Sequence, residues 1–173
     1  MGSLNYTYIM EYVPKRFNAT LEQERERNLV YQFKDGYCPD FLKEKILDRI
    51  KLIMNSFPGG SWEICFVPAS THRKTYYRYS SIDRYITEKL GVKCSIDAIS
   101  KIHDEESGHI AGKKMNPTSD FIVEEDKVSG KNIILIDDVI TRGNTFCGTA
   151  AKLTEKGASM VVGLFIAKTV HPA

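Results

Sequence analysis

The feature that most constrains the fold is a short apolar run that ends in two acidic residues and a polar loop. Residues 133–136 read Ile-Ile-Leu-Ile, Asp137 and Asp138 follow, and residues 141–145 read Thr-Arg-Gly-Asn-Thr. A continuous apolar run of this kind is typical of a strand buried on both faces, as in a parallel sheet covered by helices. Because ligands bind at the carboxyl edge of such sheets, we expect the two carboxylates to face a ligand.

Strand and helix patterns alternate along the rest of the chain. Helical periodicity or capping residues predict helices over residues 42–57, 80–90 and 144–156. Runs rich in apolar, β-branched or aromatic residues predict strands over residues 5–13, 28–33, 62–67, 94–99, 121–123, 133–136 and 160–167. Residues 101–120 hold three charge clusters, two glycines and one proline, and they predict a long loop. This alternation indicates an α/β fold in which a parallel sheet is flanked by helices.

The length and charge of the chain restrict its organisation. A chain of 173 residues fits one domain, in which we expect residues 61–173 to form the core and residues 1–60 to pack on it as an N-terminal appendage. Its apolar runs are far shorter than the ~20 residues that cross a bilayer, so we expect no membrane partner and a cytoplasmic protein. The net charge of +2 and the pI of about 8.3 give no indication of nucleic-acid binding.

The cysteines suggest a reducing compartment. Cys38, Cys65, Cys94 and Cys147 are widely spaced and form no Cys-x-x-Cys pair. Such spacing favours neither a zinc site nor a disulfide framework. We therefore expect four reduced thiols, most of them buried, as in a cytoplasmic protein.

The loop that follows the two aspartates suits a phosphate group. Gly143 allows a tight turn, and the backbone amides and two threonine hydroxyls of residues 141–145 can converge on one anion at a helix N-terminus. Asp137 and Asp138 would repel a bare phosphate. They are better suited to hydrogen-bond ribose hydroxyls or to hold Mg²⁺ through water. Together these residues predict a site for ribose 5-phosphate.

The segment over residues 137–145, Asp-Asp-Val-Ile-Thr-Arg-Gly-Asn-Thr, resembles the 5-phosphoribosyl-1-pyrophosphate (PRPP) signature of type I phosphoribosyltransferases. The resemblance extends over roughly residues 62–170. It is greatest to ComF-like members, although this chain lacks their N-terminal zinc-binding cysteines and has Arg-Tyr-Ser-Ser over residues 78–81 where they have a Gly-Phe-Asn-Gln-like stretch. The resemblance implies a single Rossmann-like phosphoribosyltransferase fold with a small N-terminal hood and a flexible lid loop.

The same resemblance implies an activity and a set of site residues. The protein would be a Mg²⁺-dependent transferase of nucleotide metabolism that moves ribose 5-phosphate from PRPP to a small nitrogen acceptor, a nucleobase, and releases pyrophosphate. Asp137 and Asp138 would be the catalytic residues that hold the ribose hydroxyls and the Mg²⁺ shell. The 5-phosphate would bind Thr141, Arg142, Gly143, Asn144 and Thr145. Pyrophosphate would bind a loop with Ala69, Ser70, Thr71, Arg73 and Lys74, and a catalytic lid would offer Lys101, His103, Lys113 and Lys114.

Several alternatives stay open at the level of sequence. The four basic lid residues could also be solvated surface charges with no role in binding: Lys101, His103, Lys113 and Lys114. Many sites of this family place an acidic residue four positions after the first threonine of the loop, where this chain has Thr145, so no general base is identified. The protein could instead be a non-catalytic PRPP or nucleotide sensor that regulates nucleic-acid metabolism or DNA uptake, or it could hydrolyse PRPP or a nucleotide. The acceptor base is undetermined, and family members often form dimers.

Overall fold

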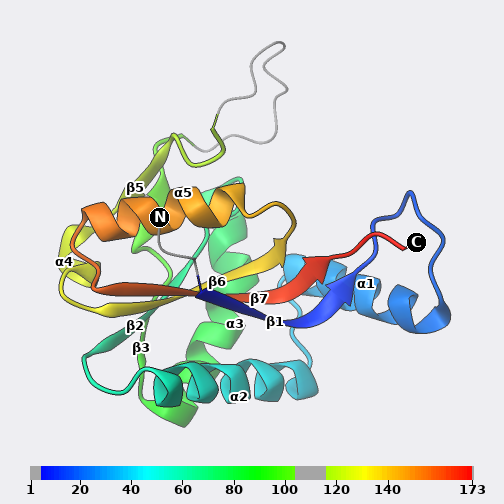
Figure 1. Cartoon of the computed structure of the whole chain (residues 1–173), viewed down its shortest axis with the longest axis horizontal. Coiled ribbons are helices and arrows are strands. Elements are labelled where there is room, and N and C mark those ends of the chain that lie inside the picture. The colour runs from blue at the N-terminus through cyan, green and yellow to red at the C-terminus, as the bar shows by residue number, and fades with distance from the viewer. Residues whose placement is uncertain (1–4, 104–115, 173) are drawn as a thin grey trace.

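The computed structural model describes residues 5–103 and 116–172, whose centre is a parallel β-sheet (Figure 1). Within these residues the sheet has five strands in the order β1-β7-β6-β2-β3, and every neighbouring pair is parallel. Their bounds are β1 Asn5–Tyr12, β2 Trp62–Phe66, β3 Lys93–Ser95, β6 Asn132–Ile140 and β7 Met160–Thr169. The predicted α/β class with a parallel sheet is confirmed.

Helices cover both faces of this sheet (Figure 1). Helices α1 (Leu21–Lys34), α2 (Asp40–Ser56) and α3 (His72–Leu90) pack on one face, whereas α4 (Glu125–Val128) and α5 (Asn144–Glu155) pack on the other. An antiparallel pair, β4 (Ile99–Lys101) and β5 (Phe121–Val123), joins the second group. Two separate apolar layers therefore sandwich the sheet.

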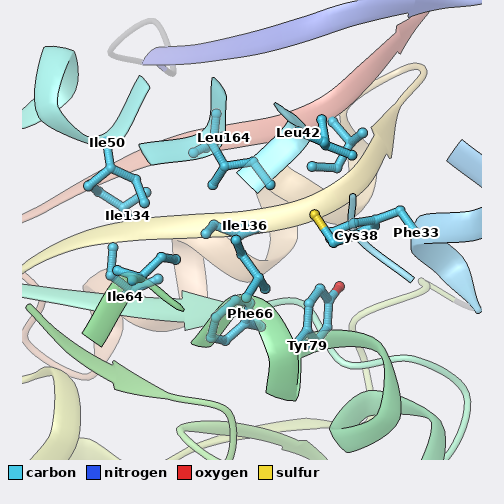
Figure 2. Packing of buried hydrophobic residues seen from close by; sticks show 14 of the residues in the cluster. Phe33, Cys38, Leu42, Ile50, Ile64, Phe66, Tyr79, Ile134, Ile136 and Leu164 are labelled. Carbon is cyan, nitrogen blue, oxygen red and sulfur yellow. The ribbon is translucent and has the colours of Figure 1, made fainter. Parts of the chain in front are cut away.

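The alternation of side chains along β6 explains why one apolar run serves both layers. Ile134 and Ile136 belong to the core under α1, α2 and α3, where Figure 2 shows them among side chains of the neighbouring strands β2 and β7. Ile133 and Leu135 point to the opposite face and join the core under α5. All four side chains are fully buried, so β6 is fixed at the centre of the fold.

The strand predicted over residues 28–33 is wrong, because these residues form the second half of α1. A capping box starts this helix: the Thr20 side chain accepts from the backbone of Gln23, whose side chain accepts from the Thr20 backbone N–H. Val30 and Phe33 lie about one turn apart and are completely buried. The first half of α1 is almost entirely polar, so the sequence shows no helical periodicity of apolar residues there.

Helix α3 begins at His72, eight residues before the predicted start at Ser80. Thr71 caps it, since its hydroxyl accepts a hydrogen bond of 3.1 Å from the backbone N–H of Lys74. The buried face of the helix includes Thr75 and Tyr79 as well as the apolar residues of the predicted part. The segment expected as a loop therefore contributes two extra turns of helix beside the loop that follows β2.

The strand predicted over residues 94–99 divides into two strands of different sheets. Residues Lys93–Ser95 form β3 at the edge of the parallel sheet, whereas Ile99–Lys101 form β4 of the antiparallel pair. The sequence predicts Lys101 at the start of a loop, but the residue lies at the end of strand β4. Most of the expected lid, residues 104–115 with Lys113 and Lys114, lies outside the described residues.

Residues before position 60 share the sheet and the core with those after it. β1 is an edge strand that pairs in parallel with β7, from Asn5 opposite Val162 to Tyr12 opposite Thr169. Helices α1 and α2 supply buried side chains to the same apolar layer as β6. All four cysteines are free thiols. Among the described residues, no helix combines the length and the apolar composition that a membrane span requires.

Candidate functional site

The candidate site lies where the central strand β6 extends beyond the end of its neighbour β2. Pairing of β6 with β2 ends at Ile136 opposite Phe66, but pairing with β7 continues to Ile140 opposite Lys168. Asp137 and Asp138 therefore lie within β6, beyond the end of β2, at the carboxyl edge of the sheet. The backbone N–H of Val67 donates to the carbonyl oxygen of Ile136 over 3.0 Å, which holds the loop after β2 beside the two aspartates.

A cavity of about 300 Å³ opens at the end of β6. Gly143 is its turning point: its φ of +82° is a left-handed conformation that favours glycine, and it caps helix α5 without a side chain. The first backbone amides of a helix have no partner within the helix, so those of α5 are available to an anion. The cavity is lined by Asp137, Val139, Ile140, Thr141, Arg142, Gly143, Asn144 and Thr145, with Pro117, Phe146 and Phe165.

All five residues expected to bind the 5-phosphate thus line one cavity together with Asp137. One of them has a partner already, because the Thr141 hydroxyl lies 2.8 Å from the hydroxyl of Thr169 at the end of β7. Either hydroxyl can be the donor. This bond joins the loop after β6 to the end of β7, and Thr141 can offer its second hydrogen-bonding capacity to a ligand.

Asp137 is the more buried of the two carboxylates, with 9% of its surface exposed. Its Oδ1 accepts from the backbone N–H of Asp138 over 2.8 Å and from the Tyr79 hydroxyl over 3.5 Å. Burial, with the neighbouring charge of Asp138 as a second cause, raises the pKa of Asp137 well above its usual range. A ligand that brings hydroxyl donors or a cation to this carboxyl would stabilise its ionised form.

Asp138 forms ion pairs with two basic side chains. Its Oδ2 lies 3.5 Å from Nη1 of Arg78 and 3.6 Å from Nζ of Lys34, while its Oδ1 accepts from the backbone N–H of Val139 over 2.6 Å. Arg78 comes from α3 and Lys34 is the last residue of α1. Adjacent residues of one strand point to opposite faces, so Asp137 and Asp138 engage different surroundings.

A second cavity of about 760 Å³ lies at these two cations. It is lined by Lys34, Asp35, Ser70, Thr71, Arg73, Lys74, Tyr77 and Arg78. Four of the five residues expected to bind pyrophosphate are among them. The fifth, Ala69, is buried, and its backbone N–H donates to the Thr75 hydroxyl over 2.9 Å, so its amide is engaged within the protein. Four cations against one carboxylate make the lining suited to an anion.

The lid residues that the structure describes line neither cavity. Lys101 in β4 places its ammonium 5.8 Å from the ring centroid of Phe121, a cation–π contact within the small sheet. His103 is an exposed residue just after that strand. The other two, Lys113 and Lys114, lie outside the described residues.

Sequence reasoning missed Lys34 and Arg78 as site residues. Lys34 directly follows residues 28–33, whose sequence predicts a strand and not the end of a helix, and it is 104 positions from Asp138. In the sequence Arg78 stands out only within the Arg-Tyr-Ser-Ser stretch of residues 78–81, and the spacing that indicates its place is helical, since Thr75, Arg78 and Tyr79 share one face of α3. Three further residues line the first cavity: Phe146 directly follows the motif, whereas Pro117 and Phe165 are distant from it in the sequence and carry no signal there.

The described residues contain no cluster of three or more His, Cys, Asp or Glu side chains that could hold a metal ion by themselves. Asp137 and Asp138 supply two neighbouring carboxyl groups. This donor set fits Mg²⁺, which is commonly held by one or two carboxylates together with water and substrate phosphates. The residues therefore suit a Mg²⁺ ion that arrives with a phosphate ligand.

Comparisons with known proteins give remote structural likenesses. No family model and no curated protein sequence matches the chain. Adenine phosphoribosyltransferase from Saccharomyces cerevisiae, in complex with an imino-altritol bisphosphate and adenine, is 17% identical with a TM-score of 0.47, covering 75% of this chain and 70% of that one. A second adenine phosphoribosyltransferase has 18% identity and a TM-score of 0.48 over 75% and 71% of the two chains. Hypoxanthine-guanine phosphoribosyltransferase from Schistosoma mansoni in complex with IMP is 12% identical with a TM-score of 0.38, covering 95% of this chain and 82% of that one.

Proposed function

We propose that the protein binds PRPP and transfers its ribose 5-phosphate to a nitrogen acceptor, with release of pyrophosphate. One observation carries this proposal: Asp137 and Asp138 adjoin two different anion-binding surroundings. Asp137 lines the cavity with the amides of the α5 N-terminus, and Asp138 pairs with cations that line the second cavity. A molecule with a polyol between two phosphate ends has the matching order of chemical groups.

The roles of the residues follow from this placement. The turn at Gly143 and the first amides of α5 would bind the 5-phosphate. Asp137 and Asp138 would accept hydrogen bonds from the ribose hydroxyls, and the basic lining of the second cavity would bind the pyrophosphate group. In this arrangement the ribose ring is held in place, and the pyrophosphate group bonded to its C1 carbon is stabilised as a leaving group.

In the reaction, a lone pair on the acceptor nitrogen forms a bond to C1 while the bond from C1 to the pyrophosphate oxygen breaks. The electron pair of that bond leaves with pyrophosphate, and the acceptor loses a proton to solvent or to a base. Cations of the second cavity stabilise the charge that develops on the leaving oxygen. Mg²⁺, when bound, would neutralise further negative charge on the diphosphate. The protein contributes mainly orientation and charge stabilisation.

Calorimetric titration with PRPP in MgCl₂ tests the binding part of this proposal. The wild type is compared with the Asp137→Asn/Asp138→Asn variant and with Asp48→Asn, an exposed aspartate of α2 that lines neither cavity. We expect binding to the wild type and the control, and at least a tenfold loss in the double variant, because charged hydrogen bonds are worth about 1.5–3 kcal/mol each. Absence of wild-type binding would refute the proposal.

Pyrophosphate release in the presence of a panel of nucleobases tests the catalytic part. One observation favours the alternative of a non-catalytic sensor: Asp137 is the only carboxylate among the described residues that line the first cavity, so no second carboxylate stands there to accept a proton. PRPP binding with no release for any base would support the sensor. Release that depends on one base would identify the acceptor, and ribose 5-phosphate formed without a base would indicate hydrolysis.

A further inference from the structure

Three charged side chains from three elements meet beside the second cavity. Oδ2 of Asp138 is shared by Nη1 of Arg78 and Nζ of Lys34, at 3.5 and 3.6 Å. The side chains of Asp138 and Arg78 are 14% and 16% exposed, and that of Lys34 is 40% exposed. The carboxylate is therefore balanced by two cations in the protein without ligand.

Arg78 is also anchored to the end of α1. Its Nε donates to the carbonyl oxygen of Lys34 over 3.4 Å. The last carbonyls of a helix have no partner within the helix and form the negative end of its dipole, so this is a favourable place for a cation. Nη1 of Arg78 thus contacts Asp138 and its Nε donates to the end of α1, and a guanidinium with five N–H donors can also bind a ligand.

The same two cations line the larger cavity, with Arg73 and Lys74. Both contacts, at 3.5–3.6 Å, are longer than the roughly 2.7–2.9 Å of a charge-assisted hydrogen bond, and water also screens the pair with Lys34, whose side chain is 40% exposed. A diphosphate offers several charged oxygens and accepts bidentate hydrogen bonds from a guanidinium, which are stronger. A diphosphate in this cavity would therefore compete with Asp138 for Arg78 and Lys34.

We propose that Arg78 and Lys34 exchange partners on ligand binding: they hold Asp138 in the free protein and move to the diphosphate group when it enters the second cavity. This inference rests on the proposed function and adds two binding residues to it. The exchange releases Asp138 to accept hydrogen bonds from the ribose hydroxyls at the moment when the ligand supplies them. In the free protein, the two cations offset the repulsion between Asp137 and Asp138.

Inorganic pyrophosphate is the probe, because it requires neither turnover nor the 5-phosphate cavity. We expect calorimetry to show about tenfold weaker binding in Arg78→Met and in Lys34→Met, since each removes a charged contact to the anion. Lys51→Met, which removes an exposed lysine of α2, is the matched control and keeps wild-type affinity. Far-ultraviolet circular dichroism verifies that each variant is folded.

The exchange itself is observed through the side-chain carboxyl ¹³C resonance of Asp138, assigned by its absence in Asp138→Asn. It is expected to shift when pyrophosphate is added to the wild type, and to start near the shifted position in an Arg78→Met/Lys34→Met variant. An unchanged resonance, or equal affinity in the methionine variants, overturns the exchange even where PRPP binds. A wild type that binds neither PRPP nor pyrophosphate overturns the proposed function and the exchange together.

Discussion

The hydroxyl of Tyr79 lies 3.5 Å from Oδ1 of Asp137 and 2.8 Å from the carbonyl oxygen of Val67. The side chain is fully buried, and its ring stacks on that of Phe66 at a centroid distance of 4.6 Å (Figure 2). Burial, followed by the charge of Asp137, raises the pKa of Tyr79 well above 10, so the hydroxyl stays a neutral donor at neutral pH. One residue of α3 thus joins the loop after β2 to the buried carboxyl of β6.

Replacing Tyr79 by phenylalanine should test this link. Tyr79→Phe keeps the buried ring and removes only the hydroxyl, which leaves the Val67 carbonyl without that donor. We expect the free energy of unfolding to fall by about 1–2 kcal/mol in urea denaturation. Tyr76→Phe, on the same helix but 65% exposed, should change it by less than about 0.5 kcal/mol. Equal stability of the two variants would show that the Tyr79 hydroxyl bonds contribute nothing.

We expect Asp137 to strengthen ligand binding and to lower the free energy of unfolding of the protein without ligand. An acid whose folded pKa is raised destabilises the native state at pH values above its unfolded pKa of about 3.9, and the loss grows until pH exceeds the folded pKa. Asp137→Asn should therefore be more stable than the wild type at pH 7, by about 1 kcal/mol, and equally stable below about pH 4. Urea denaturation at both pH values measures this. A variant that is less stable at pH 7 would contradict the burial argument.

The central part of the site could be predicted from sequence because its determinants are local. Residues 133–136 define a buried strand by composition alone, and Gly143 follows at a distance that a strand–loop–helix unit requires. The structure adds that β6 extends four residues further than the apolar run, so the aspartates are strand residues. Pairing with β7 holds these polar residues in the strand, and composition cannot reveal a pairing partner.

The contact of Lys34 and Arg78 with Asp138 could not be predicted, since it depends on where two helices end. Lys34 reaches the site only because α1 runs to that residue and packs under β6, whereas the composition of residues 28–33 predicts a strand. Arg78 reaches it because α3 starts at a cap eight residues before the predicted start. Both contacts join segments that are distant in sequence, which propensity and periodicity do not encode.

Gly143 should be required for its backbone conformation. Its φ of +82° costs a residue with a side chain about 1–2 kcal/mol, whereas the nearest atom to an added Cβ, Cδ1 of Ile140, would lie at an ordinary 3.8 Å. We expect Gly143→Ala to weaken the binding of ribose 5-phosphate about tenfold in calorimetry, because relaxation of the turn moves the amides of α5.

Gly59→Ala is the matched control for this variant. Gly59 has a φ of +95° and no atom within 4 Å of an added Cβ, and it lies before β2, away from the lining of either cavity. It should lose similar stability and keep full affinity for ribose 5-phosphate. Equal affinity in Gly143→Ala would show that the turn does not shape the phosphate site.

The four thiols should differ widely in reactivity. Cys147 is exposed, whereas burial raises the pKa of Cys38 and that of Cys94 to about 12 and raises the pKa of Cys65 further. A disulfide reagent at pH 8 should therefore modify one thiol per chain rapidly, and the remaining three only after unfolding in urea. Cys147→Ser should abolish the rapid phase, and a rapid phase that persists would place a reactive thiol elsewhere.

Gly148 should be required for the docking of residues 116–120 on α5. A Cβ at this position would overlap Oγ1 of Thr118 and lie 3.0 Å from its Cγ2, and Thr118 is 1% exposed. The same turn carries Pro117, which lines the phosphate cavity. Gly148→Ala should therefore destabilise the protein by about 1–3 kcal/mol and weaken the binding of ribose 5-phosphate, as measured by urea denaturation and calorimetry.

A second background separates this contact from the intrinsic helix preference of alanine. In the interior of a helix, glycine to alanine normally stabilises by roughly 0.5–1 kcal/mol. In a Thr118→Ala background, where the overlapping atoms are gone, Gly148→Ala should therefore be stabilising, and the change of sign gives the coupling energy between the two positions. The same effect of Gly148→Ala in both backgrounds would mean that the contact with Thr118 does not hold the turn against α5.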